Sequence, residues 1–167
     1  MTNARLSIEL EGETDLTVTR RFHAPPALVY RAHTDPELVQ RWMLGPPGWS
    51  MPVCEMDVRP GGAFRHEYSN GAGAGFAIVG EYVALEPDRR IVHVERMLMP
   101  DPTPDNNIDT LFEPDNSGTR MVLRMSLPDA GCRKAMLETG MADGMETSYA
   151  NLDALVVAEL EGRKGVS

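Results

Sequence analysis

Residues 132–160, CRKAMLETGMADGMETSYANLDALVVAEL, contain no proline and repeat apolar side chains every three or four positions. This spacing places those side chains on one stripe of a helix, as Leu137, Met141, Met145, Tyr149, Leu152, Val156 and Leu160. At 1.5 Å per residue, one continuous helix of this length would run about 40 Å. Such a helix is too long to lie within a sheet, but it can lie across one. The stretch therefore predicts an α+β fold in which the last helix packs on a sheet.

The chain between about residue 53 and residue 127 is predicted to be almost entirely β structure. Apolar and polar residues alternate in six segments separated by Gly, Pro, Asn and Asp, at 53–60, 63–69, 76–86, 91–99, 108–113 and 119–127. A further segment alternates from Leu16 and reaches Phe22 after what we interpret as a slip of one residue. Because most of the connections are tight turns, we expect one curved antiparallel meander of about six to seven strands.

Two short helices are predicted between the first strand and the meander. Residues 26–33, PALVYRAH, begin with a proline that the first turn of a helix tolerates. Residues 35–43, DPELVQRWM, form the second helix, with Thr34 or Asp35 as its N-cap and Pro36 at its first position. The loop LGPPGWSMP follows at residues 44–52.

Composition and charge exclude several classes of function. The 167 residues carry a net charge of −9 with acidic residues spread along the chain, so we expect no nucleic-acid partner. The polar N-terminus is unlike a signal peptide, and no apolar run approaches the roughly 18 residues of a membrane span. Two isolated cysteines, Cys54 and Cys132, are typical of a reducing compartment. We therefore expect a cytoplasmic protein without membrane contact, present as a monomer or homodimer.

The domain is expected to occupy residues 14–162, after a polar leader at 1–13 and before a flexible tail at 163–167. No second composition or repeat divides this stretch, and its length suits a single domain with a continuous core.

The segment MDVRPGGAFRHEYS, residues 56–69, contains an unusual mixed row of side chains. Strand alternation places Phe64, His66 and Tyr68 on one face and Arg65 and Glu67 on the other. The charged pair is typical of a solvent face, so we expect the mixed row to point towards the last helix.

Neighbouring strands extend this inner face with aromatic and methionine side chains. Their inward rows are predicted to be Phe76, Ile78, Gly80 and Tyr82, and Met121, Leu123 and Met125. Plain core packing explains such rows, but 11 methionines and a mid-strand Gly80 favour a cavity, since methionine adapts to varied apolar partners. Gly140 and Gly144 in the last helix indicate either a ligand or a neighbouring helix at close approach.

Titratable residues in the meander leave two interpretations open. His93 and Glu95 share one strand face, and if it points inward they join His66 in a cluster able to act as acid and base. The alternative is a satisfied polar patch, because no HxH or HExxH spacing completes a ligand set; we expect no metal and no cofactor. Cys54 is interpreted as a small buried side chain, Trp42 as a core residue, and Trp49 as either core or a lid.

Five segments in order resemble a known family: RRFHAPPALVYRAHTDPELVQRWM (20–43), DVRPGGAFRHEY (57–68), GEYVALEPDRRIVHVE (80–95), GTRMVLRMSL (118–127) and GMADGMETSYANLDAL (140–155). Together they are similar to the START-like or helix-grip superfamily (SRPBCC, birch-pollen-allergen-like). Within it they resemble the family named for the activator of the 90-kDa heat-shock-protein ATPase. The resemblance covers about residues 15–161 and implies a sheet wrapped around the final helix with a cavity between them. The motifs of the additional N-terminal domain by which eukaryotic co-chaperones grip the chaperone do not occur here.

In that inferred fold, we expect a small, largely hydrophobic molecule to bind between the sheet and the last helix. The predicted apolar contacts are Trp42, Phe64, Phe76, Tyr82, Met121, Met141 and Met145, and the polar contacts are His66, Tyr68 and Glu95. Two alternatives remain: a co-chaperone-type module that acts on a heat-shock-protein ATPase, and a polyketide cyclase- or lyase-like enzyme that uses His66, His93 or Glu95. No catalytic residue is predicted for the ligand-binding reading.

Overall fold

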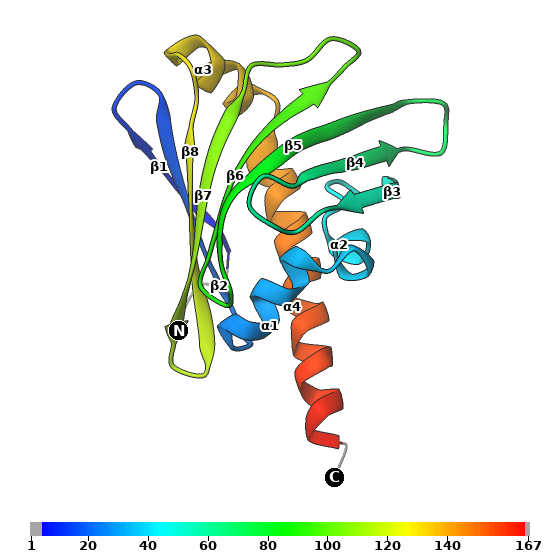
Figure 1. Cartoon of the computed structure of the whole chain (residues 1–167), viewed down its shortest axis with the longest axis vertical. Coiled ribbons are helices and arrows are strands. Elements are labelled where there is room, and N and C mark those ends of the chain that lie inside the picture. Colours follow the sequence, from blue (N-terminus) through cyan, green and yellow to red (C-terminus); the bar gives the residue numbers. More distant parts are fainter. Residues whose placement is uncertain (1–4, 166–167) are drawn as a thin grey trace.

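A computed structural model describes residues 5–165 as one curved sheet wrapped around a long C-terminal helix (Figure 1). The elements are β1 (Ser7–Glu11), β2 (Asp15–Phe22), α1 (Pro26–Thr34), α2 (Pro36–Trp42), β3 (Ser50–Met56), β4 (Ala63–Ser69), β5 (Gly75–Glu86), β6 (Arg90–Leu98), β7 (Asn106–Asp115), β8 (Gly118–Ser126), α3 (Ala130–Glu138) and α4 (Met141–Gly165). All strand pairs are antiparallel, in the order β1-β2-β8-β7-β6-β5-β4-β3. The α+β helix-grip prediction is confirmed, with eight strands rather than six to seven.

The additional strand, β1, lies in the segment expected to be a polar leader. It pairs with β2 at the edge of the sheet, with Ile8 opposite Val18 and Leu10 opposite Leu16. At the other end, α4 continues to Gly165 and so includes part of the expected tail. The remainder of these two predictions, residues 1–4 and 166–167, lies outside the described residues.

β2 alternates without the slip that we expected. The buried face of β2 carries every second residue without a shift, namely Leu16, Val18, Arg20 and Phe22. The sequence suggested a slip in this row because Arg20, a charged side chain, takes a position on an otherwise apolar face. Its guanidinium forms two hydrogen bonds of 3.0 Å with the carboxylate of Glu146 on α4, which compensates the buried charge.

The two short helices form where their capping residues predict. Pro26 opens α1, and the Asp35 carboxylate caps α2 by accepting a hydrogen bond of 3.0 Å from the backbone N–H of Glu37. α1 lies against β7 and β8, whereas α2 lies against β3. Both helices also contact α4, so they fill one end of the space inside the sheet.

The C-terminal helix is broken near its start, which corrects the expectation of one continuous helix over residues 132–160. Gly140 has φ +78°, a left-handed conformation that ends α3 and that glycine adopts without a steric cost. No atom lies within 4 Å of a side chain built at Gly140. This glycine therefore serves the chain reversal between α3 and α4 rather than a close approach to the helix.

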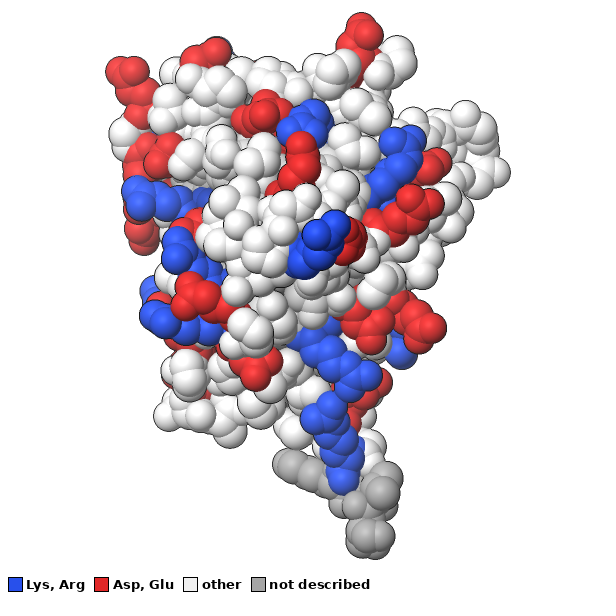
Figure 2. Space-filling model, in the orientation of Figure 1, with Lys and Arg blue, Asp and Glu red and all other residues white. Residues whose placement is uncertain are grey.

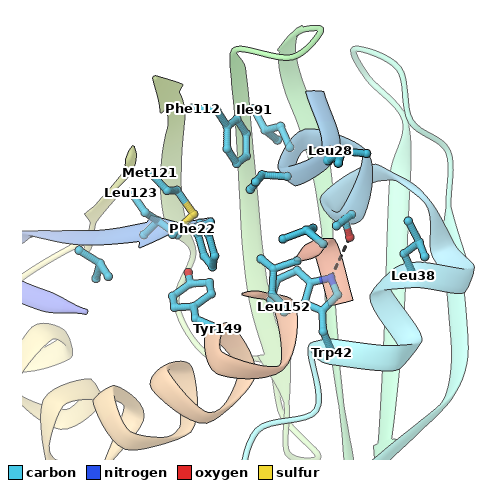
Figure 3. Close-up of a cluster of buried hydrophobic side chains, with 14 of the residues drawn as sticks. Phe22, Leu28, Leu38, Trp42, Ile91, Phe112, Met121, Leu123, Tyr149 and Leu152 are labelled. Atoms are coloured by element: carbon cyan, nitrogen blue, oxygen red, sulfur yellow. Dashed lines mark hydrogen bonds between the residues drawn. The ribbon is translucent and has the colours of Figure 1, made fainter. Parts of the chain in front are cut away.

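The main core lies between α4, the two short helices and the strands β2, β7 and β8. Figure 3 shows Tyr149 and Leu152 of α4 pointing towards Phe22, Met121 and Leu123 of the sheet. The Trp42 indole N–H donates a hydrogen bond of 2.8 Å to the Ala32 carbonyl, and its ring stacks on Tyr149 with centroids 6.0 Å apart. The apolar stripe of the helix is thus confirmed as the surface that holds the domain together.

Candidate functional site

The helices cover the concave face of the sheet unevenly. Leu16, Val18 and Met121, on β2 and β8, are 0% exposed, so this half is sealed. On β6, by contrast, the inward side chains of His93 and Glu95 keep 17% and 27% of their surface exposed. We call the half of the concave face formed by β3–β6 the accessible half, because His93 and Glu95 keep part of their side-chain surface exposed there.

The register of the sheet brings polar side chains together on this accessible half. Phe64, Gly80, Glu95 and Asn106 are successive cross-strand partners on β4, β5, β6 and β7. His93 lies two residues from Glu95 on the same face, and His66 lies two residues from Phe64. Cross-strand partners and next-but-one residues are the nearest neighbours on one sheet face. We refer to the four residues His66, His93, Glu95 and Asn106 as the polar cluster.

Gly80 connects the cluster by allowing Phe64 to lie across β5. A Cβ at Gly80 would overlap the carbonyl oxygen of Val94 and lie 2.7 Å from Cζ of Phe64. The Phe64 ring fills this position and contacts both histidines, with centroids 5.1 Å from His66 and 5.6 Å from His93. The sequence led us to expect an open space at Gly80. The structure shows none, because the Phe64 ring occupies this position.

Within the polar cluster, His93 and Glu95 are hydrogen-bonded to each other. Nε2 of His93 is 2.8 Å from Oε1 of Glu95, and both side chains point inward, which settles the orientation that the sequence left open. A carboxylate only accepts hydrogen bonds, so Nε2 carries the proton when Glu95 is ionised. In the neutral imidazole, Nδ1 of His93 is then a hydrogen-bond acceptor.

Three buried atoms of the polar cluster have no hydrogen-bond partner: Nε2 of His66, Nδ1 of His93 and Oδ1 of Asn106. His66 and Asn106 are among the few buried polar residues of the described chain. A buried polar atom without a partner typically costs about 1–3 kcal/mol, so native proteins satisfy nearly all of them. Within the chain itself, therefore, the polar cluster is only partly hydrogen-bonded.

Burial and the Glu95 carboxylate dominate the electrostatics around the cluster. Burial lowers the pKa of His66 to about 4, although Glu95 acts in the opposite direction and His93 adds to the lowering. The pKa values of Tyr68 and Tyr149 are raised, mainly by burial and next by the charge of Glu95. Glu95 thus acts on groups from β4 and from α4, which places its carboxylate centrally between the sheet and the helix.

Aromatic and methionine side chains surround the polar cluster. Tyr68 and Phe76 stack with centroids 4.8 Å apart, and the half-buried Trp49 packs on Phe76 at 5.3 Å. Met145 and Met141 lie about one and two helical turns before Tyr149 on α4 and are only half-buried. The accessible half of the concave face is therefore apolar on both sides of a polar centre.

The structure places the ten predicted site residues in two groups. Trp42 and Met121 belong to the sealed core and are 1% and 0% exposed. The remaining eight are Phe64, His66, Tyr68, Phe76, Tyr82 and Glu95 on strands β4–β6, and Met141 and Met145 on α4, where both methionines pack against the main core. A Cβ at Gly144 would lie 3.8 Å from Cδ of Pro46 in the 44–49 loop, so its nearest neighbour within the chain is a loop rather than a helix.

Two features of the site were missed by sequence reasoning. The predicted segments 91–99 and 108–113 leave Asn106 in the connection between them, whereas in the structure it belongs to β7, where Asn106, Ile108, Thr110 and Phe112 alternate strictly and are all buried. The ion pair of Arg20 and Glu146 joins residues that are 126 positions apart, so no local pattern predicts it. The alternation of β7 was a usable signal, whereas the partner of Arg20 was not.

The structure also bears on whether Cys54 could act as a nucleophile and on whether the chain could hold a metal ion. Burial raises the pKa of the Cys54 thiol to about 11, which disfavours the thiolate that a nucleophile needs. Among residues 5–165, no group of three or more His, Cys, Asp or Glu side chains is arranged to hold a metal ion. The polar cluster contains one carboxylate, that of Glu95, and two imidazoles. The structure shows a hydrogen bond to Glu95 from His93.

Other hollows and charges of the surface lie away from the cluster. One open depression of about 520 Å³ is lined by Ala158, Glu159, Gly162 and Arg163 near the end of α4. Another, of about 360 Å³, lies along β3 and β4 and is lined by Glu55, Met56, Asp57, Ala63, Phe64 and Arg65. On the face shown in Figure 2, acidic and basic side chains are interspersed. Neither depression combines apolar walls with unpartnered buried polar atoms.

Comparison with known proteins defines the class to which this fold and site belong. The profile of the family described as Activator of Hsp90 ATPase homolog 1-like protein matches residues 23–157. A Rhodobacter sphaeroides protein of known structure is 26% identical with a TM-score of 0.86, over 92% of this chain and 99% of that chain. Protein NE0264 of Nitrosomonas europaea is 28% identical with a TM-score of 0.80, over 91% and 99% of the two chains. The chain belongs to the Activator of Hsp90 ATPase homolog 1-like family.

A curated relative extends the similarity to a much longer protein. An uncharacterized protein of Schizosaccharomyces pombe is 31% identical over 83 residues, which are 50% of this chain. The match spans only 20% of that protein's length. Within residues 5–165, none of the helices has the length and apolar character needed to cross a bilayer.

The buried histidines predict a specific pH dependence of stability. Burial lowers the pKa of both His66 and His33 to about 4, below the ordinary value of 6.5. Between about pH 4 and pH 6.5 the unfolded chain therefore binds more protons than the folded chain, so stability is complete above pH 6.5 and declines towards pH 4. Each histidine contributes on the order of 2–3 kcal/mol across this window.

Urea unfolding of the wild type and of His66→Gln from pH 4 to pH 8 measures this effect. Between pH 4 and pH 6.5, the slope of the unfolding free energy against pH should be smaller in the variant by the contribution of about one bound proton, because glutamine does not titrate. A variant with the same slope as the wild type, or a His66 ring resonance that titrates near pH 6.5, would contradict the prediction.

Proposed function

We propose that the protein binds a small, largely apolar molecule on the accessible half of its concave face, with the polar cluster holding the polar group of that molecule. The observation that carries the proposal is the set of three buried, unpartnered atoms on His66, His93 and Asn106. Ligand sites are typically apolar clefts with a few convergent polar groups, and unsatisfied buried atoms are stabilised when a ligand supplies their partners.

The surroundings of the cluster support the same proposal. Phe64, Tyr68 and Tyr82 are well buried on the sheet side, while Met141 and Met145 stay half-buried on the helix side. Methionine side chains adapt to ligands of varied shape because they are unbranched and polarizable. An apolar molecule lying between them would cover surface that the folded chain leaves exposed, at about 25 cal/mol per Å² of apolar area.

The neutral fluorescent probe N-phenyl-1-naphthylamine tests the proposal, since its emission rises in apolar surroundings. It should bind the folded wild type, and Met145→Trp should weaken binding about tenfold or more by filling the space beside the cluster. Met99→Trp provides the comparison, because Met99 is 60% exposed and lies just after β6. Equal probe affinity in the wild type and in Met145→Trp, with both variants folded, would contradict the proposed location.

A second candidate function is acid–base catalysis on the bound molecule. Its specific support is the 2.8 Å contact between His93 and Glu95, in which a carboxylate orients a histidine whose other nitrogen is free. Turnover of a bound compound that His93→Gln abolishes without loss of probe binding would favour this function. The co-chaperone alternative has the family description as its support, and stimulation of a heat-shock-protein ATPase by the purified protein would favour it.

A further inference from the structure

The polar cluster offers mostly hydrogen-bond acceptors to a ligand. Oδ1 of Asn106 is an acceptor, and Nδ1 of His93 is an acceptor when the imidazole is neutral, because its Nε2 proton is directed to Glu95. The Glu95 carboxylate adds further acceptor sites. A molecule that satisfies these atoms must therefore bring at least one N–H or O–H group.

His66 completes the arrangement with the opposite capacity. Burial keeps its imidazole neutral near pH 7, with a pKa of about 4, so one ring nitrogen carries a proton and the other does not. In the tautomer with the proton on Nε2, the unpartnered atom of His66 donates. A hydroxyl group, which donates through its hydrogen and accepts through its oxygen, matches both kinds of partner.

The charges that face this space disfavour an anion. Glu95 carries the carboxylate nearest the unpartnered atoms, and the second acidic residue between sheet and helix is Glu146. Within the described part of the chain, Arg20 is the one Lys or Arg side chain on the buried rows of the sheet. Its guanidinium is already engaged by both oxygens of Glu146 and by the Arg21 carbonyl, so the buried rows of the sheet within residues 5–165 offer no free cation to a bound carboxylate.

From this geometry we infer that the site selects an apolar molecule with an uncharged hydrogen-bond donor, such as an alcohol or a phenol, and rejects the corresponding carboxylate. The inference rests on the proposed function and specifies its ligand class. Fatty acids, which would bring a second carboxylate beside Glu95, are excluded by the same argument, because like charges at close range in a partly buried site repel strongly.

Three compounds with one ring system test the inference by displacement of N-phenyl-1-naphthylamine at pH 7.5. 2-Naphthol carries a donor, 2-methoxynaphthalene lacks it, and 2-naphthoate replaces it with a carboxylate. We expect 2-naphthol to bind about tenfold tighter than either of the other two, which is the range of one or two hydrogen bonds. Equal or tighter binding of 2-naphthoate or 2-methoxynaphthalene would overturn the inference while leaving the proposed function in place.

A pair of variants identifies Glu95 as the source of the selection. Glu95→Gln removes the charge but keeps the shape, so the preference for 2-naphthol over 2-naphthoate should fall about tenfold. Glu81→Gln is the matched control, since Glu81 lies on the neighbouring strand but faces outward, where it pairs with Arg96. An unchanged preference in folded Glu95→Gln would overturn the inference. Absence of probe binding to the wild type would instead overturn the proposed function, and the inference with it.

Discussion

Replacing Leu152 with aspartate is expected to unfold the domain. Leu152 is 0% exposed and lies at the centre of the α4 stripe, among side chains from the sheet and both short helices (Figure 3). Removing a buried leucine side chain costs about 2–5 kcal/mol, and burying an unpaired carboxylate adds several more. The sum approaches the whole stability of a typical domain, about 5–15 kcal/mol. Loss of the near-ultraviolet circular dichroism signal and of a cooperative thermal transition would show it.

Asn151→Asp is the matched control for this variant. It introduces the same charge one residue earlier on the same helix, at an exposed position. Exposed substitutions of this kind usually change stability by less than about 0.5 kcal/mol. If Leu152→Asp had the same thermal midpoint as the wild type, the α4 stripe would not be the buried surface that we describe.

The second large effect is expected at the buried ion pair between β2 and α4. Arg20 is 4% exposed, and its partner Glu146 also accepts a hydrogen bond of 2.8 Å from the backbone N–H of Leu6. Arg20→Met should destabilise the domain by about 3–5 kcal/mol, because it leaves the carboxylate buried without its cation. Denaturant unfolding of the variant measures this loss directly.

A double variant separates the cost of an unpaired charge from the value of the pair. In Arg20→Met combined with Glu146→Met, neither charge remains, so most of the lost stability should return. The exposed pair of Arg120 and Glu113 provides the comparison, since Glu113→Gln should change stability by no more than about 1 kcal/mol. A double variant less stable than Arg20→Met alone would contradict this account of the pair.

Local sequence patterns predicted most of the fold, because the relevant forces are local. The strands from β3 to β8 begin and end within about four residues of their predicted limits, as alternation and turn residues act over a few positions. Asp35 and Pro36 marked the start of α2 for the same reason. The break at Gly140 was missed because a glycine inside a helical pattern reads equally as a weak helix position or as an end.

The candidate site was only partly predictable, because it depends on contacts between distant segments. Alternation placed His66 and Tyr68 on the inward face, and the structure confirms that both are buried. It did not show that Phe64 would cross Gly80 to reach His93, nor which half of the concave face α4 would leave accessible. Both follow from strand register and from the path of the helix, which the sequence of a single strand does not contain.

The central claim, that an apolar molecule binds between the polar cluster and α4, is tested most directly by the methyl resonances of the methionines. In protein labelled with ¹³C at the methionine methyl groups, saturating 2-naphthol should shift the signals of Met141 and Met145, which are half-buried on α4. The signal of Met99, which is 60% exposed, should stay in place. Unchanged Met141 and Met145 signals at saturation, or a shift confined to Met99, would contradict the account.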